Sequence, residues 1–365
     1  MRKNKEPLFH IVKRGEMPWY CSWGIRAASI LLAVIVSGIV TILVTGENPI
    51  RLFATILDGS FGSNRKFMVL LQNTAMLLCV ALALTPAFKM RFWNIGGEGQ
   101  ALAGALAAAA CMILMKNQSN WLVISCMVVS SLVAGALWGV IPAFFKAKFG
   151  TNETLFTLMM NYVAIQLVAF FSVLWENPKG SGKIGVINPN SKIGWFPEIL
   201  DSKYALNILI VVLLTVAMFM YLKYTKHGYE ISVVGESERT ARYIGIKVEK
   251  VIVRTMVISG ALCGLAGLLL VGGTNHTLNS DIVDGRGFTA VVVAWLGKFN
   301  PIWMVLTSLL LVFLERGAGE IATDFGLNSS FGDILTGIIL FFIIGSEFFI
   351  RYKLCLTRSG KKEEK

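Results

Sequence analysis

The chain alternates between long apolar runs and short polar connections. The longest runs span residues 27–45, 67–88, 121–145, 154–175 and 204–222, and none of them contains a charged residue. Each is close to the ~20 residues that a helix needs to cross ~30 Å of hydrocarbon. Because backbone amides cannot stay unpaired in lipid, runs of this length must be helical. The pattern therefore predicts an all-α integral membrane protein.

Further apolar runs complete a polytopic bundle of about ten transmembrane helices. They span residues 99–115, 255–273, 288–297, 300–314 and 334–350. The run at 288–297 is too short to cross alone, so we expect one short or broken helix packed inside the protein. The run at 99–115 begins with a stretch rich in Gly and Ala, and Gly260 and Gly264 form a GxxxG pair. Small residues let helix backbones approach closely, which predicts that both helices lie inside the bundle.

Composition and charge support this class. Charged residues make up only 15% of the chain, against about 25% in ordinary soluble domains. A net charge of +12 is also typical of nucleic-acid binding, but its distribution indicates topology instead. An even number of spans puts both termini on one face, where most of the 34 Lys and Arg residues fall. Positively charged loops stay inside, so both termini are predicted to be cytoplasmic, with membrane lipid and no nucleic acid as partner.

This topology divides the chain into three parts. Residues 1–26 form a cytoplasmic N-terminal segment without a cleavable signal peptide, 27–350 form the transmembrane domain, and 351–365 form a basic cytoplasmic tail. Two polar excursions interrupt the transmembrane domain. The loop at 176–203 is external and rich in Gly, Pro, Asn and Ser, whereas the loop at 223–254 is cytoplasmic.

The first segment with candidate chemistry is Asn94–Gln100, which leads from a basic turn into the Gly/Ala-rich helix. A carboxylate at membrane depth costs on the order of 3 kcal/mol, so Glu98 needs a partner or a water-accessible edge. Glycines around it, including Gly97, permit unusual backbone angles and close approach. We interpret the segment either as a broken or re-entrant start of a pathway-lining helix, or as an interfacial turn in which Glu98 pairs with Lys89 or Arg91.

A second segment, Thr151–Tyr162, starts a helix. Thr151 or Asn152 is a suitable N-cap, and Glu153 suits the positive end of the helix dipole. Asn161 lies inside the following apolar run. It is predicted either to bind substrate or to hydrogen-bond a neighbouring helix.

The third segment lies in the cytoplasmic loop. Ser237 can cap a short helix over 238–244, and Gly245 suits the left-handed residue that ends one. Such a helix could receive force from a soluble motor; the alternative is a solvated connecting loop.

The sequence shows no motif for catalysis or for binding a metal or cofactor. Lys179–Lys183 (KGSGK) resembles a phosphate-binding loop, but Ile184 follows where Ser or Thr is needed, and the loop is external. The six cysteines share no regular spacing, and the three histidines lie far apart. We therefore expect a non-enzyme without cofactors. If ATP drives this protein, another chain hydrolyses it.

These segments resemble the permeases of the branched-chain amino acid/ribose/nucleoside class of ABC importers. The resemblance is strongest to the first permease of bacterial general nucleoside importers. It is carried by Asn94–Gln100 (NIGGEGQ), Thr151–Tyr162 (TNETLFTLMMNY), Gly228–Gly245 and Gly287–Pro301 (GFTAVVVAWLGKFNP), in the family's order over about residues 65–345. The cytoplasmic loop resembles the permease coupling loop, although Arg239 and Thr240 replace the Glu and first Ala of its EAA pattern.

The resemblance implies a nucleoside permease of the bacterial cytoplasmic membrane that works by ATP-driven alternating access. Its implied partners are an ABC ATPase subunit, a second homologous permease and an external substrate-binding lipoprotein. The implied substrate-pathway residues are Asn94, Gly97, Glu98, Gln100, Asn161 and Trp295, and those of the coupling loop are Glu236, Arg239, Thr240, Ala241 and Gly245. The alternatives are a permease for ribose-like sugars or branched-chain amino acids, and a proton-coupled secondary carrier that uses Glu98.

Overall fold

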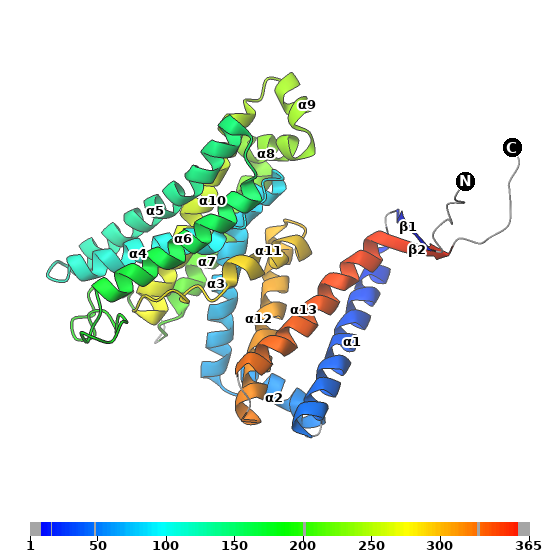
Figure 1. Cartoon of the computed structure of the whole chain (residues 1–365), viewed down its shortest axis with the longest axis horizontal. Coiled ribbons are helices and arrows are strands. Elements are labelled where there is room, and N and C mark those ends of the chain that lie inside the picture. The colour runs from blue at the N-terminus through cyan, green and yellow to red at the C-terminus, as the bar shows by residue number, and fades with distance from the viewer. Residues whose placement is uncertain (1–8, 16, 47–48, 200–201, 327–328, 357–365) are drawn as a thin grey trace, which may run out of the picture. The chain divides into compact units, whose positions relative to one another are not determined.

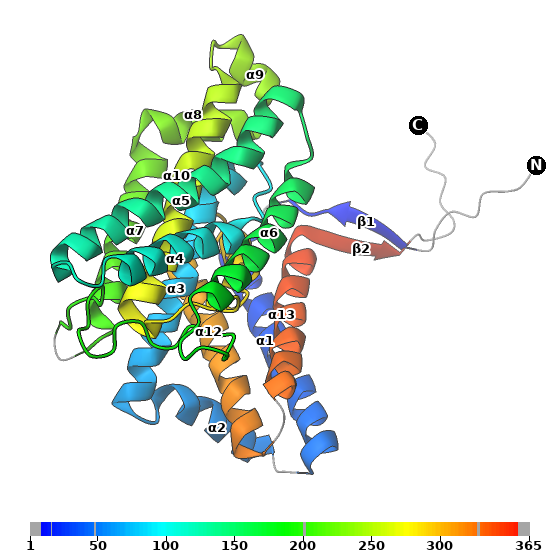
Figure 2. The same cartoon turned by 60° about the vertical axis from the view of Figure 1, so that its left-hand side comes forward.

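The chain folds into helices that form two compact units (Figures 1 and 2). The computed structural model describes residues 9–15, 17–46, 49–199, 202–326 and 329–356. The larger unit comprises residues 63–312, and the smaller unit combines 1–62 with 313–365. We describe each unit by itself.

Four helices form the centre of the larger unit. They are α3 (Asn64–Lys89), α4 (Gly97–Leu114), α5 (Asn120–Phe149) and α10 (Val248–Leu270). Helix α10 contacts the other three, and a π-helical turn, η1 (Val271–Asn275), continues it. Most residues of α3, α4 and α10 are buried, which confirms the expected central position of the Gly/Ala-rich helix.

Glycines allow α4, α5 and α10 to touch at the backbone. A Cβ on Gly104 of α4 would overlap backbone atoms of Gly264 in α10, and a Cβ on Gly135 of α5 would overlap the Gly260 carbonyl. The GxxxG pair predicted from the sequence therefore lies in a helix interface. The Ser131 hydroxyl also donates a hydrogen bond to the Gly104 carbonyl across this interface, at 2.9 Å. Close packing of this kind replaces the hydrophobic driving force that lipid does not supply.

The remaining helices of the larger unit surround this centre. They are α6 (Glu153–Leu174), α7 (Ala205–Tyr224), α8 (Lys226–Glu236), α9 (Glu238–Tyr243), α11 (Arg286–Leu296) and the start of α12 (Pro301–Asp324). Helix α6 contacts α4, α7 contacts α3, and α11 contacts both α3 and α4. Helices α8 and α9 close one end of the unit, where buried side chains of both join an apolar cluster with α3, α5 and α10.

The smaller unit contains both ends of the described chain. It consists of α1 (Trp19–Thr45), α2 (Pro49–Phe61), the end of α12, α13 (Ser329–Arg351) and two strands. Strands β1 (Phe9–Lys13) and β2 (Tyr352–Leu356) pair antiparallel, with His10 opposite Cys355. This pairing brings the two chain ends together, as termini on one face require; that this face is cytoplasmic stays a prediction.

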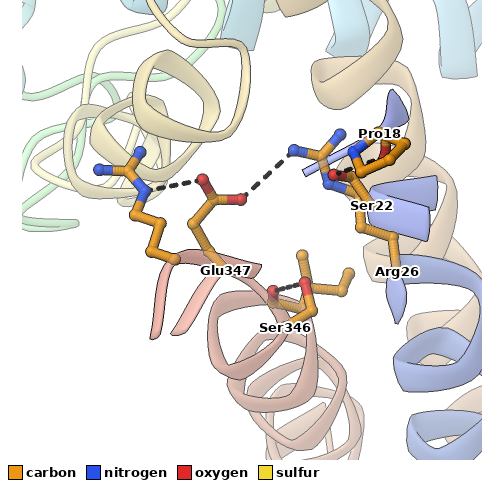
Figure 3. A network of polar contacts seen from close by, with 7 residues as sticks. Pro18, Ser22, Arg26, Ser346 and Glu347 are labelled. Atoms are coloured by element: carbon orange, nitrogen blue, oxygen red, sulfur yellow. Dashed lines mark hydrogen bonds and ion pairs between the residues drawn. The ribbon is translucent and has the colours of Figure 1, made fainter. Parts of the chain in front are cut away.

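An ion network joins α1 to α13 within the smaller unit (Figure 3). The Glu347 carboxylate accepts hydrogen bonds from the guanidinium groups of Arg26, at 3.3 Å, and Arg351, at 2.9 Å. Each oxygen has its own arginine partner, so the carboxylate is paired on both sides. This arrangement satisfies three charged groups close to the end of the helix pair.

The predicted helix content is confirmed. In the described part of the chain, nine helices are long and apolar enough to cross a membrane, and the eleven-residue α11 is the expected short helix. Within the predicted cytoplasmic loop, Ser237 caps α9 by accepting the Thr240 amide, and Gly245 is left-handed, as expected. Asn152, the second of the two candidate caps, accepts the Leu155 amide at the start of α6.

Several expected helix boundaries were wrong. Helix α1 begins at Trp19 rather than residue 27, α10 begins at Val248 rather than residue 255, and α12 reaches Asp324 rather than residue 314. Apolar runs mark only the lipid-buried part of a helix, and charged turns extend it beyond that part. Helix α2 was missed because Arg51 and Asp58 interrupt its apolar pattern. Much of the predicted terminal segments, residues 1–8 and 357–365, lies outside the described residues.

Candidate functional site

The segment between α3 and α4 turns back into the interior of the larger unit. Asn94 is completely buried, and its amide exchanges two hydrogen bonds with the Gln100 amide, at 3.2 and 3.3 Å. The Asn94 Nδ2 also reaches Ser259 Oγ, near the middle of α10, at 3.3 Å, and its Oδ1 accepts the Gly96 amide. Non-helical backbone is tolerated at this depth because protein groups satisfy it. The start of α4 is thus a buried, non-helical turn, as the interpretation of a broken helix start predicted; that it is re-entrant in the membrane or lines a pathway stays a prediction.

Helix α6 holds the same turn from the other side. Asn161 Oδ1 accepts the Gly99 amide at 2.9 Å, and its Nδ2 donates to the Ile95 carbonyl at 2.9 Å. Thr157 Oγ1 accepts the Ile95 amide at 3.2 Å. Of the two roles predicted for Asn161, the structure shows the hydrogen bond to a neighbouring segment. A role in substrate binding stays a prediction.

Glu98 links the N-termini of two helices. The side chain belongs to the first turn of α4 and is 5% exposed. Its Oε2 accepts the Gly287 amide at 2.7 Å, and its Oε1 accepts the Gly285 amide at 3.1 Å, both at the start of α11. Neither Lys89 nor Arg91 is its hydrogen-bond partner, so the predicted alternative pairing is replaced by backbone capping. A carboxylate is favoured here because two positive helix ends meet at it.

The close approach of α4 and α11 depends on Gly287. A Cβ at this position would lie 2.8 Å from the Cα and Cβ of Glu98, which is closer than real atoms pack. At its other end, α11 places Trp295 against Trp93, with ring centroids 5.3 Å apart and nearly parallel planes. Trp295 therefore contacts the residue next to Asn94, at the edge of the turn in which the predicted pathway residues Asn94, Gly97, Glu98, Gln100 and Asn161 gather.

The predicted coupling residues separate into exposed and buried positions. Glu236, Arg239, Thr240 and Gly245 are exposed, whereas Ala241 is fully buried against the ends of α3, α5 and α10. Ala241 therefore attaches α9 to the membrane helices. Two neighbouring residues that the sequence analysis did not select are exposed as well: Tyr243 at 92% and Ile244 at 51%. Their large apolar side chains on a polar loop could have identified them.

A polar cavity of about 300 Å³ lies between α3, η1 and the segment that leads into α11. Its wall contains the polar residues Gln72, Asn73, Lys203, Tyr204, Thr274, Asn275, Asn279, Asp281, Asp284 and Arg286, and the apolar residues Val69, Met76, Leu270 and Ile282. This volume is at the lower end of the ~300–1,000 Å³ of small-molecule pockets. Adjacent Gln72 and Asn73 inside an apolar run were a sequence signal for it, which the analysis above did not use.

The loop predicted to be external packs onto this cavity wall. The Trp195 and His276 rings stack with centroids 3.7 Å apart, and the Ile187 amide donates to the His276 carbonyl at 2.7 Å. Phe196 likewise donates to the Gly272 carbonyl in η1 at 3.0 Å. Burial and the nearby Lys203 ammonium lower the pKa of His276 to about 4, so the imidazole is neutral at pH 7. In the described part of the chain, no group of three or more His, Cys, Asp or Glu side chains could hold a metal ion.

The apolar helices of the described chain, with the buried turn and the short α11 between them, are typical of a polytopic membrane protein. Residues 67–344 match the model of the family described as "Branched-chain amino acid transport system / permease component". The match covers most of the chain, which therefore belongs to this family of permease components. It is a multi-pass protein of the cytoplasmic membrane.

Relatives extend the likeness over nearly the whole chain. The nucleoside ABC transporter permease protein NupB of Lactococcus lactis is 30% identical, over 90% of this chain and 92% of that protein. The guanosine ABC transporter permease protein NupP of Bacillus subtilis is also 30% identical, over 87% and 92%. The glucose ABC transporter permease protein TsgB13 of Haloferax volcanii is 26% identical, over 93% and 92%. All three are permease proteins of ABC transporters, and this chain is a transporter subunit of the same kind.

Proposed function

We propose that this chain translocates nucleosides across the cytoplasmic membrane as one of two permease subunits of an ABC importer. One observation carries the choice of substrate: relatives named for nucleosides and guanosine are 30% identical over about nine tenths of the chain. A glucose permease at 26% identity keeps sugars as the second candidate. Both candidates carry several hydroxyl groups, which suits a polar cavity better than it suits an apolar one.

ATP hydrolysis is assigned to a separate subunit that binds the end of the larger unit closed by α8 and α9. Exposed Tyr243 and Ile244 supply an apolar surface for it, with Arg239 and Thr240 beside them. Buried Ala241 fixes α9 to α3, α5 and α10, so a displacement of α9 is transmitted to the central helices. The ATPase would thereby drive alternating access without contacting the membrane helices themselves.

The second permease subunit and an external substrate-binding lipoprotein complete the proposed importer. The Bacillus subtilis relatives include a second guanosine permease protein, NupQ, which is 25% identical to this chain over 67% of its length. Two related permeases in one organism are consistent with a heteromeric pair. On the opposite end from α9, the loop at 176–203 is the surface proposed for the binding lipoprotein.

Uptake of a labelled nucleoside tests the substrate. Cells with the gene, without it, and with a plasmid copy restored would be compared for tritiated guanosine or adenosine uptake. Excess unlabelled nucleoside, ribose, glucose or leucine would be added in turn. We expect uptake to depend on the gene and to be suppressed by nucleosides alone. Suppression by glucose or leucine instead would replace the nucleoside assignment with the corresponding family alternative.

Purification of the tagged chain tests the partners. We expect an ATPase subunit and a second, related permease to co-purify, and Tyr243→Ala to weaken retention of the ATPase without changing membrane levels of the chain. Tyr162→Ala is the matched control, because this tyrosine is also exposed, at 63%, but belongs to α6. Purified wild-type chain that transports substrate without any ATPase would overturn the proposal.

A further inference from the structure

The wall of the polar cavity includes a buried amide side chain whose nitrogen has a hydrogen-bond partner and whose oxygen has none in the described part of the chain. Gln72 is 3% exposed, and its Nε2 lies 3.5 Å from Thr274 Oγ1. Its Oε1 accepts no hydrogen bond from the described part of the chain. Buried polar atoms in proteins nearly always have a partner, so an unpaired amide oxygen in a cavity wall indicates a place for a ligand's donor.

The charges around the cavity select against a strongly charged ligand. Its two carboxylates, Asp281 and Asp284, are balanced by Lys203 and Arg286, and Arg286 lies 4.0 Å from Asp284. The wall thus presents donors and acceptors in similar numbers with little net charge. Hydroxyl groups match such a wall because each can donate and accept.

The cavity wall also includes apolar side chains and an aromatic ring. Tyr204 lines it together with four aliphatic or thioether side chains, which are Val69, Met76, Leu270 and Ile282. The Lys203 ammonium lies over the Tyr204 ring, 5.1 Å from its centroid, which fixes the cation at the edge of this surface. A flat, weakly polar group can therefore pack against the Tyr204 ring while hydroxyl groups bind polar side chains of the wall.

We propose that this cavity is a substrate site in which the ribose hydroxyls of a nucleoside bind Gln72 and Asp281 while the base lies against Tyr204. The nucleoside part of this inference rests on the proposed function. Recognition of hydroxyl groups is drawn from the cavity itself and applies equally to a sugar.

The site is connected to the buried turn at the start of α4 through the backbone. Asp284 and Arg286 alternate with Gly285 and Gly287, whose amides bind the Glu98 carboxylate. A ligand that binds this segment therefore contacts the stretch of backbone that joins α11 to Glu98 of α4. His276, which follows the lining residue Asn275, stacks on Trp195 of the loop at 176–203. Occupancy of the cavity would thus be communicated to the external loop and to the centre of the bundle.

Protection of an introduced cysteine tests the site directly. Asn279 is exposed and lines the cavity, so Asn279→Cys provides a reporter for labelling with a fluorescent maleimide. Labelling would be carried out in freeze–thawed membranes that contain the full transporter and are open on both faces. The parent chain gives the background from native cysteines, and Ser191→Cys, at an exposed loop position outside the cavity lining, is the matched control.

Adenosine or guanosine should slow labelling of Asn279→Cys at least threefold and leave Ser191→Cys unchanged. The 2′,3′-dideoxy analogue should need about tenfold more ligand, equivalent to roughly 1.4 kcal/mol. Adding Gln72→Leu or, separately, Asp281→Asn should weaken protection by the nucleoside by a similar factor. Asp281 is exposed, so its variant tests the site without disturbing a buried position.

The results separate the site from the substrate. Gene-dependent nucleoside uptake without protection by any nucleoside or sugar would overturn the site and leave the proposed function intact. Protection by ribose or glucose alone, with no nucleoside uptake, would overturn the proposed function and support hydroxyl recognition. Equal protection by the dideoxy analogue, or unchanged protection in both variants, would refute the assignment of Gln72 and Asp281.

Discussion

Replacement of Glu98 by Gln removes one of the two acceptors that bind the start of α11. The carboxylate is 5% exposed and accepts the Gly285 and Gly287 amides at 3.1 and 2.7 Å. A Gln side chain keeps one carbonyl oxygen, whereas its NH₂ group faces an amide donor. Hydrogen bonds to a charged group contribute about 1.5–3 kcal/mol each, so Glu98→Gln should cost about that amount of stability. Glu98→Ala leaves the buried Gly287 amide unpaired, at about 1–3 kcal/mol, and also removes the acceptor of the exposed Gly285 amide.

Hydrogen–deuterium exchange locates the effect. We expect the amides of residues 285–287 to exchange roughly 10- to 150-fold faster in Glu98→Gln, because each 1.4 kcal/mol changes an equilibrium tenfold. The purified full-length chain in detergent should also show a lower midpoint of thermal unfolding. Glu249→Gln is the control: its side chain is 48% exposed and pairs with Arg242, so the change should cost at most about 1 kcal/mol.

The same variant separates capping from proton transport. If Glu98 carried protons, Glu98→Gln would abolish transport while exchange at residues 285–287 and the unfolding midpoint stayed at wild-type values. That combination would refute the capping argument. Both oxygens already accept backbone amides, so we expect the opposite result: altered exchange and stability, with transport reduced in proportion to the loss of folded protein.

Three further predictions follow from the packing and the loops. Gly264→Ala should destabilise the larger unit by about 1–3 kcal/mol, because the added Cβ would overlap the Ser131 carbonyl. Unfolding in mixed micelles measures this loss. An unfolding midpoint equal to that of the wild-type chain would contradict the close approach of the helices. Tyr243→Ala should lower substrate-stimulated ATPase activity at least fivefold at unchanged expression, and unaltered activity would place the ATPase elsewhere. Hydrogen bonds from the Gly180 and Gly182 amides lower the pKa of Glu176 below its ordinary 4.5, so this loop is stabilised above that pH. That stability should be lost as the pH falls through the pKa of Glu176 in the folded chain, so the loop of the wild-type chain should be cleaved faster by protease at low pH. In Glu176→Gln, which cannot titrate, the rate of cleavage should change little with pH.

The sequence predicted the helical membrane class and the location of the break between α3 and α4 because both have strong local signals. Runs of about 20 uncharged, apolar residues form α-helices in lipid, because only a helix pairs all of their backbone polar groups within the run. The three glycines of NIGGEGQ, with buried Asn94 and Gln100, likewise marked a place where the chain could leave a helix. Within the loop predicted to be cytoplasmic, Ser237 and Gly245 predicted both ends of α9.

Partners that lie far apart in the chain could not be predicted. Glu98 binds amides nearly 190 positions away, and a backbone amide carries no residue-type signal. The cavity likewise combines Gln72 from α3 with residues 203–204 and 270–286, which only the fold brings together. Ala241 was predicted as part of the coupling loop, and that role stays a prediction. The sequence of a six-residue helix does not reveal which of its faces is buried.

Backbone contact between α4, α5 and α10 also determines how the larger unit can move. Where glycines face each other, no side chains lie between the helices, so there are no rotamers whose rearrangement could absorb a displacement. If α9 is displaced, as the proposed coupling requires, side-chain repacking at these glycine contacts cannot absorb the displacement. The three helices must therefore travel as one stiff block, and any change that opens or closes a path has to occur outside these contacts, at the borders of the block with the surrounding helices.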